Sequence, residues 1–497
     1  MSRKQAELYF TMTNQEFGNM LNKLTIKQAK EGLKKKKFSS VELTKACLDQ
    51  IKKTDDKLNV FVTLTEDQAL DESQKADNIL ASQGETLEAL KNKPLLGIPI
   101  AIKDNFSTEG IRTTASAKVL DDYNPPFDST VVRKLKDAGI VLLGKTNMDA
   151  WAHGSSTETS DYGPTRNPWN TEYLPGGSSG GSAASVAAEQ CIAAIGSETA
   201  GSIRQPASWC GVVGLKPTYG RVSRYGVIAM GSSLDSPGPI TKTVEDSALI
   251  LNVLAGRDEM DATTSPLPVK NYLNELNFDI KNLIIGISDE YFNGVVPEVK
   301  ECVKKAINKL GSLGAKIETI KLFDPKYAID VYTIIQRSEV SSNLARYDGI
   351  RYGNDRSYFG EEAKRRIMFG THALSSGYYD QYYNKASKVR SVIIEDFKKA
   401  FEKVSVIIAP TSPTLALPIG STKDSAMFGE LADVLVEPSS IAGLSGINIP
   451  IGFSKSDLPI GMQIIGPQFA EEKILQVANN YELETQNEDW RHKAPDL

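Results

Sequence analysis

Two short segments rich in glycine and serine contain residue types that nucleophilic catalysis needs. Residues 175–182 read PGGSSGGS, and residues 197–206 read SETAGSIRQP. Clustered Gly and Ser residues cost backbone entropy, so they mark either a flexible linker or a place where backbone N–H groups approach a ligand closely. Both segments adjoin apolar elements directly, at 183–188 and at 191–195, which argues against a linker. We therefore expect a functional site where these two segments meet.

Phosphate binding is the first chemistry to consider, because residues 139–146, GIVLLGKT, match the spacing of a P-loop. A P-loop requires a glycine-tolerant loop whose N–H groups surround the phosphates. The intervening residues Ile-Val-Leu-Leu predict a buried strand instead. We therefore disfavour a nucleotide-binding loop at this position.

A serine nucleophile with a histidine base is the second possibility, because residues 176–180 fit the pattern G-x-S-x-G around Ser178. That α/β-hydrolase chemistry needs a histidine that follows the nucleophile in the chain. His153 precedes Ser178, and His492 lies in the polar C-terminal tail. His372 stands in a helical stretch with no acidic partner evident from the sequence. This interpretation is therefore disfavoured as well.

A serine nucleophile activated by lysine is the third possibility. It requires a lysine that can lose its proton, a hydroxyl that relays the proton, and backbone donors that face the developing oxyanion. Lys103 is the candidate base because it ends the apolar run 97–102, so that a strand would carry its ammonium into the interior. Burial among apolar strands can lower a lysine pKa by the ~3 units that a base near neutral pH needs. A lysine that merely extends from a strand end to water is the alternative.

The elements that must position these residues follow a regular alternation. From about residue 95, short apolar runs alternate with helical patterns, which implies crossover connections and a largely parallel or mixed sheet. The chain therefore predicts a single large α/β domain at 25–497, with a mixed central β-sheet covered by helices on both faces. The expected strands are 98–102, 140–143, 191–195, 283–287, 315–320, 404–409, 447–453 and 459–465.

Two segments depart from this alternation. Residues 340–400 are helical and rich in Tyr and Arg, and we expect them to form an inserted helical layer. Residues 1–24 are polar and aperiodic, and we expect a poorly ordered leader.

Composition limits the function classes. The 497 residues are 40% apolar and 24% charged, as in soluble globular proteins, and the net charge of −5 does not predict a nucleic-acid surface. The four cysteines are scattered without a C-x-x-C pair, so neither a zinc site nor any other metal site is expected. The N-terminus lacks a signal peptide's apolar region, and no run of 18 apolar residues occurs. We expect a cytoplasmic protein that contacts no membrane.

Five segments together resemble the amidase signature family, in register from about residue 30 to 480. They are GIPIAIKDN at 97–105, GKTNMD at 144–149, PGGSSGGS at 175–182, GSIRQP at 201–206 and GLKPTYGR at 214–221. The resemblance implies the amidase signature fold, with Ser202 as the nucleophile, Ser178 as the proton shuttle and neutral Lys103 as the terminal base. It also implies a cis peptide bond before Ser178. The implied oxyanion hole consists of the backbone N–H groups of Thr199, Ala200, Gly201 and Ser202.

Within the family, three further segments resemble the branch that hydrolyses glutamine for tRNA-dependent amidotransferases. They are GRVSRYG at 220–226, KRRIM at 364–368 and AGLSG at 442–446. The resemblance implies that Arg366 (or Arg365) binds the α-carboxylate of glutamine and that Asp433 binds its α-ammonium group. An ordinary surface ion pair is the alternative for each.

The same resemblance implies partners. The ammonia would pass to a B subunit that uses ATP and Mg to amidate glutamyl-tRNA(Gln), and a small C subunit would wrap around this chain. The tRNA would be bound mainly by the partner, and this chain itself would hold no cofactor and no metal.

One segment departs from the family pattern. ETAG at 198–201 stands where the family more often has DTGG. We expect Ala200 to narrow the conformations of the oxyanion loop, which would slow the reaction. Two alternatives stay open: a free-standing amidase acting on another small amide, and a catalytically inactive scaffold subunit.

Overall fold

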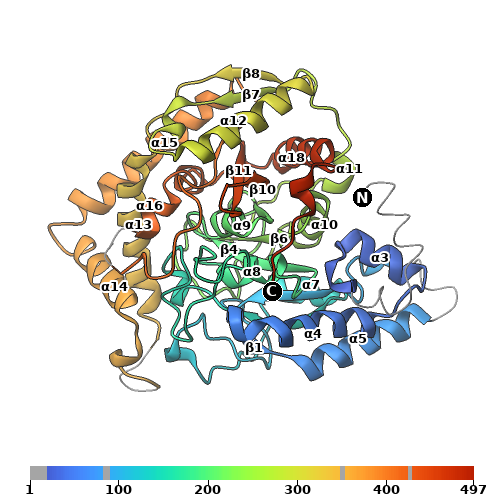
Figure 1. The fold of residues 1–497 in the computed structure, drawn as a ribbon. Helices are drawn as coiled ribbons and strands as arrows, with labels where there is room; N and C mark the ends of the chain where they lie inside the picture. Colours follow the sequence, from blue (N-terminus) through green and yellow to red (C-terminus); the bar gives the residue numbers. More distant parts are fainter. Residues whose placement is uncertain (1–19, 82–89, 348–352, 424–427) are drawn as a thin grey trace.

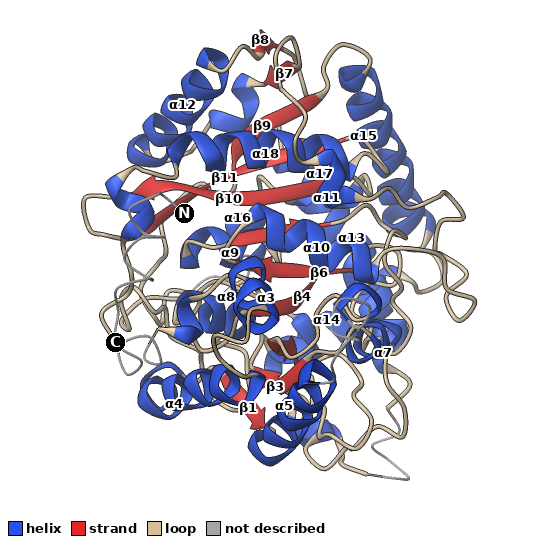
Figure 2. Cartoon of the chain, turned by 90° about the vertical axis from the view of Figure 1, so that its right-hand side faces the viewer, coloured by secondary structure: helices blue, strands red, loops and turns tan. Residues whose placement is uncertain are grey.

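The computed structural model describes residues 20–81, 90–347, 353–423 and 428–497 (Figure 1). Its centre is one mixed sheet of eleven strands. The strands are β1 (Phe61–Leu64), β2 (Pro99–Lys103), β3 (Val141–Thr146), β4 (Ala193–Glu198), β5 (Val213–Lys216), β6 (Ser236–Thr241), β7 (Ile284–Ile287), β8 (Lys316–Thr319), β9 (Val406–Pro410), β10 (Ser445–Phe453) and β11 (Pro459–Gly466). They lie in the order β1-β3-β2-β4-β6-β5-β10-β11-β9-β7-β8, which Figure 2 shows from β1 at the bottom to β8 at the top.

Helices surround this sheet, and the predicted single α/β domain with a mixed sheet is confirmed (Figures 1 and 2). The α-helices are α3 (Ile26–Lys34), α4 (Ser40–Leu58), α5 (Glu66–Ala81), α7 (Thr130–Asp137), α8 (Gly180–Ala187), α9 (Arg204–Cys210), α10 (Val244–Leu254), α11 (Tyr272–Glu275), α12 (Pro297–Ser312), α13 (Lys326–Leu344), α14 (Glu361–Ala373), α15 (Lys385–Phe401), α16 (Phe428–Asp433), α17 (Glu437–Ile441) and α18 (Glu471–Thr485). Among the residues that the structure describes, no helix is both long and apolar enough to cross a membrane.

All eight expected strands are present, and no end is shifted by more than three residues. Three further strands, β1, β5 and β6, were not expected. The sequence of β6, SPGPIT, is more typical of a turn than of a central strand. Strand β5 pairs with β6 only at Ile240 and Thr241, so Pro237 and Pro239 lie where a missing N–H costs no ladder hydrogen bond to β5.

The P-loop-like segment forms a strand, as its apolar residues predict. Every residue of β3 is buried. The Lys145 ammonium donates to the Phe106 carbonyl and to Thr113 Oγ1, each at 2.7 Å. Its hydrogen bonds are therefore made within the protein and not to a phosphate.

The ends of the predicted leader and of the helical layer differ from expectation. Residues 1–19 lie outside the described residues, but Leu21 and Leu24 are buried, so the end of the predicted leader belongs to the folded core. Their apolar side chains stand out from the polar segment around them and explain this packing. The helical layer begins earlier than about 340, since α13 already starts at Lys326 and packs on α14 and α15.

The small-residue helix α8 lies at the centre of the molecule, and all eight of its residues are buried. Glycine is needed at its start because a Cβ at Gly180 would lie 2.0 Å from Thr157 Oγ1, and one at Gly181 would lie 2.4 Å from the Asn147 carbonyl oxygen. Ser182 bonds to Thr146 Oγ1 at 2.7 Å. The Gly/Ser segment is therefore a tightly packed helix start that holds the preceding Ser178 in place.

Candidate active site

The site lies at the carboxyl ends of two parallel neighbours, β2 and β4. Lys103 is the last residue of β2, and Glu198 is the last residue of β4. Ser178 lies two residues before α8, and Ser202 lies in the short connection between β4 and α9. Ligand sites in α/β sheets commonly occur at such strand ends, because the following loops converge there.

Lys103 and Ser178 are in direct contact. The Lys103 ammonium donates to Ser178 Oγ at 2.8 Å and to the Ser197 carbonyl oxygen at 3.1 Å. Lys103 is fully buried, and burial lowers its pKa to about 7, although Asp149, Asp235 and Glu198 oppose the shift. The lysine can therefore be neutral near physiological pH, which a base requires.

Ser202 is brought to the same place by contacts between the two Gly/Ser segments. The Ser179 N–H donates to the Ser202 carbonyl oxygen at 3.1 Å, and the Gly177 N–H donates to Gln205 Oε1 at 3.0 Å. The intervening Gly177–Ser178 peptide bond is cis, as the resemblance implies. Ser202 is 4% exposed. The three predicted residues thus lie on adjoining segments of one buried site.

The loop before Ser202 presents backbone donors. Within the described residues, the N–H groups of Ala200, Gly201 and Ser202 have no protein acceptor. Ala200 does not have a positive φ, and its carbonyl oxygen accepts from Ser440 Oγ at 2.5 Å. Alanine therefore introduces no positive-φ strain at this position. Gly201 is constrained instead, because a Cβ would lie 2.4 Å from Asp433 Oδ1.

A buried ion pair holds this loop from both ends. Glu198 accepts from Arg204 Nε at 2.9 Å and from Arg204 Nη2 at 2.6 Å. Its other oxygen accepts the backbone N–H groups of Ile203 and Arg204, each at 3.0 Å. Because Glu198 ends β4 and Arg204 begins α9, the pair closes the loop that carries Ser202.

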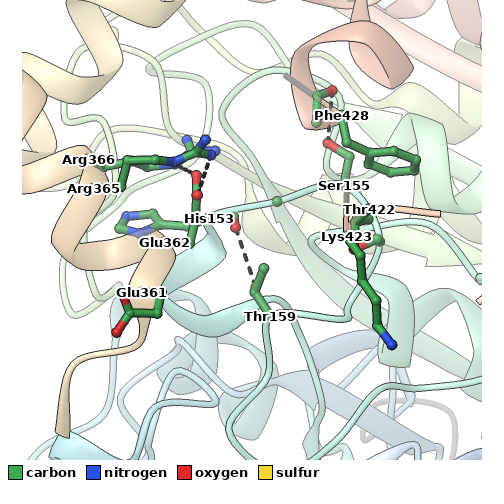
Figure 3. A pocket seen from close by; sticks show the side chains of 13 residues that line it. His153, Ser155, Thr159, Glu361, Glu362, Arg365, Arg366, Thr422, Lys423 and Phe428 are labelled. Carbon is green, nitrogen blue, oxygen red and sulfur yellow. Dashed lines mark hydrogen bonds and ion pairs between the residues drawn. The ribbon is translucent and has the colours of Figure 1, made fainter. Parts of the chain in front are cut away.

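A pocket of about 410 Å³ lies next to these residues. It is lined by His153, Gly154, Ser155, Ser156, Thr159, Glu361, Glu362, Arg365, Arg366, Thr422, Lys423, Phe428 and Gly429. Figure 3 shows His153, Glu362 and the two arginines on one side, and Ser155, Thr422, Lys423 and Phe428 on the other. The pocket adjoins the serine segment, since a Cβ at Gly177 would lie 2.6 Å from the Ser156 nitrogen.

Arg366 lies within this pocket wall, and only 4% of it is exposed. It donates to Glu362 Oε1 at 2.5 Å and to Gln336 Oε1 at 2.9 Å. The side chain of Arg365 is 42% exposed and pairs with Glu362. The burial of Arg366 excludes an ordinary surface ion pair and distinguishes it from its neighbour.

Asp433 lies between the pocket and the loop of Ser202. It accepts from Ser155 Oγ at 2.6 Å, and its Oδ1 lies against Gly201. It is buried, so it also does not form a surface ion pair. The Asp433 carboxylate is thereby held against Gly201, the residue that precedes the predicted nucleophile Ser202.

Three residues of the site were not identified from the sequence: Ser155, Gln336 and Glu362. They position Asp433 and Arg366, from segments far from the Gly/Ser motifs. Glu362 could have been suspected, because it stands four residues before Arg366 on a helix. Nothing in the sequence marks Ser155 or Gln336 as partners of residues so distant in the chain.

Comparisons with known proteins agree with this geometry. The amidase family model matches residues 42–475. The A subunit of glutamyl-tRNA(Gln) amidotransferase from Desulfatibacillum aliphaticivorans is 48% identical, over 96% of this chain and 100% of its own. The protein of the same name from Moorella thermoacetica is 49% identical, over 95% of this chain and 98% of its own. The crystal structure of the protein of this name from Thermotoga maritima is 41% identical, has a TM-score of 0.81, and covers 96% of this chain and 98% of its own. The chain belongs to the amidase family.

Proposed function

We propose that this chain is the glutaminase subunit of a tRNA-dependent amidotransferase and hydrolyses the side-chain amide of glutamine to glutamate and ammonia. The observation that carries the proposal is the place of Asp433, whose carboxylate lies against Gly201, next to Ser202. An amide substrate at Ser202 would meet this anion close to the reacting bond, which suits the α-ammonium group of a short amino acid. The names of the similar proteins support the same assignment.

The reaction begins with a proton transfer along the serine–lysine contact. Neutral Lys103 accepts the proton of Ser178 Oγ across 2.8 Å, while Ser178 accepts the proton of Ser202 Oγ. Ser202 Oγ then forms a bond to the side-chain carbonyl carbon of glutamine. The negative oxygen that results is stabilised by the N–H groups of Thr199, Ala200, Gly201 and Ser202, and one such donor is commonly worth about 3 to 4 kcal/mol.

Collapse of this intermediate breaks the C–N bond. The proton returns from Lys103 through Ser178 to the leaving nitrogen, so ammonia departs and a γ-glutamyl ester on Ser202 remains. Water then attacks the ester, with the same serine and lysine accepting and returning its proton, and glutamate leaves. Each proton that enters the relay is returned, so the enzyme is regenerated unchanged.

The proposal extends to the partners and their location. The ammonia would serve a B subunit that amidates glutamyl-tRNA(Gln) with ATP and Mg, in a cytoplasmic complex that also contains a small C subunit. The names of the relatives, each of which denotes one component of an amidotransferase, support an enzyme of several chains.

The substrate is tested by charge removal at the two residues that would bind the ends of glutamine. Asp433→Asn and Arg366→Gln should each raise the KM for glutamine by about 10-fold or more, because each removes one charge-assisted contact. Cleavage of a neutral aryl amide should change little, which controls for folding. Equal losses on both amides would contradict glutamine as the substrate and favour a general amidase.

A further inference from the structure

His153 is a buried residue of the pocket that the mechanism above does not use. Only 1% of it is exposed, yet it lines the cavity beside Arg366 and Glu362 (Figure 3). Among the residues that the structure describes, neither ring nitrogen has a hydrogen-bond partner. Buried polar groups are nearly always paired, and each exception calls for an explanation such as a missing ligand.

The charges around His153 indicate which kind of chemical group would bind to its ring. Burial holds the pKa of His153 well below 6.5, and the charges of Arg366 and Arg337 lower it further. The imidazole is therefore neutral, with one N–H donor and one acceptor nitrogen. A cation would be repelled by the two guanidinium groups, whereas an anion would be attracted to them. Beside these guanidinium groups, the N–H of neutral His153 can therefore donate to a carboxylate.

The other charged groups of the pocket lie on two walls, and each wall suits one end of an amino acid. Asp433 and Ser155 lie on the side of Gly201, where a cationic group fits. Arg366 is held on the opposite wall by Glu362 and Gln336. His153 belongs to this second wall, so its N–H and the Arg366 guanidinium can bond to the same anion.

We infer that His153 is a specificity-determining residue that donates a hydrogen bond to the α-carboxylate of bound glutamine, alongside Arg366. The inference rests on the proposed glutaminase function. It makes the pocket select for amides that carry a free carboxylate, and it gives the unpartnered imidazole its hydrogen bond when the substrate is bound.

The test compares glutamine with its α-methyl ester, which keeps the side-chain amide and the ammonium group but lacks the carboxylate. Ammonia release is measured for the full chain in complex with its partner subunits, for wild type, His153→Leu and His153→Gln. His153→Leu should raise the KM for glutamine by about 10- to 100-fold with little change in kcat, the size expected for one lost hydrogen bond to a charged group. The KM for the methyl ester should stay within about 2-fold, since this substrate lacks the charged partner. His153→Gln keeps a neutral N–H donor and should recover most of the affinity for glutamine.

The alternative outcomes separate this inference from the function on which it rests. An unchanged KM for glutamine in His153→Leu, or equal losses on glutamine and the methyl ester, would overturn the role of His153 alone. A wild-type complex that releases no ammonia from glutamine would overturn the proposed function and this inference together. If His153→Leu does not fold, the test uses His153→Met, whose side chain has nearly the volume of histidine. The KM values for glutamine and for the methyl ester then decide in the same way.

Discussion

At the scale of single residues, the central feature is a lysine whose pKa is lowered by burial to about 7, so that it can be neutral and accept a proton near neutral pH. Within the described part of the chain, no carboxylate contacts the Lys103 ammonium, which bonds to a hydroxyl and a carbonyl oxygen. Lys145, by contrast, lies 3.7 Å from Asp104, and its pKa is lowered only to about 8. The sequence indicated Lys103 because an apolar strand ends there. It could not indicate Gln336 as a partner of Arg366 or Ser155 as a partner of Asp433, since these pairs come from segments that only the fold brings together.

The first prediction is a pH dependence. Below about pH 7 Lys103 is protonated and cannot accept a proton, so kcat/KM for glutamine should fall about 10-fold per pH unit below that value and level off above it. Lys103→Arg keeps the positive charge at all accessible pH values and should be inactive throughout. Activity that persists unchanged down to about pH 5 would contradict the role of neutral Lys103.

The second prediction contrasts two neighbours in the oxyanion loop. Gly201→Ala places a Cβ 2.4 Å from both Asp433 Oδ1 and Val436 Cγ2, so it should displace the loop and lower kcat/KM by at least about 10-fold. Ala200→Gly relieves no strain, because φ at Ala200 is not positive, and it should not raise kcat. A large gain in kcat from Ala200→Gly would show that alanine does restrict this loop.

At the scale of elements, β4 and α9 act as one unit because the Glu198–Arg204 pair joins them. Arg204 also donates to Gln463 Oε1 at 2.8 Å and to the Val436 carbonyl oxygen at 3.0 Å, so the unit is tied to β11 and to the residue before α17. Apolar runs were enough to predict eight strands. Strand β6 was missed because its proline and glycine residues are typical of a turn, and its pairing depends on neighbours far away in the sequence.

The third prediction concerns this ion pair. Glu198→Gln leaves the buried guanidinium without its charge partner, so the free energy of unfolding should fall by about 3 to 5 kcal/mol. Urea denaturation of the purified chain measures this change, and kcat should fall with it because the loop of Ser202 loosens. Lys27–Glu245 is a matched control on the surface: Glu245→Gln should cost less than about 1 kcal/mol. A loss of similar size in both variants would contradict the special role of the buried pair.

At the scale of the whole molecule, the sheet serves to assemble a site from distant parts of the chain. The pocket is lined by residues from 153–159, 361–366, 422–423 and 428–429, and the proposed catalytic residues are 103, 178 and 202. The alternation of apolar runs and helices predicted the α/β class and the strand end that carries Lys103. The closing of the pocket by α14 and α16 depends on tertiary packing, and no local pattern contains that information.

The measurement that tests this account most directly is ammonia release from glutamine, for wild type and Ser202→Ala, with and without the partner subunits. We predict that the wild-type complex releases ammonia and that Ser202→Ala releases none above background, because the variant lacks the hydroxyl that attacks the amide. Circular dichroism and complex formation should be the same for both proteins. Continued ammonia release by Ser202→Ala would contradict Ser202 as the nucleophile, and a wild-type complex that releases none would contradict the glutaminase itself.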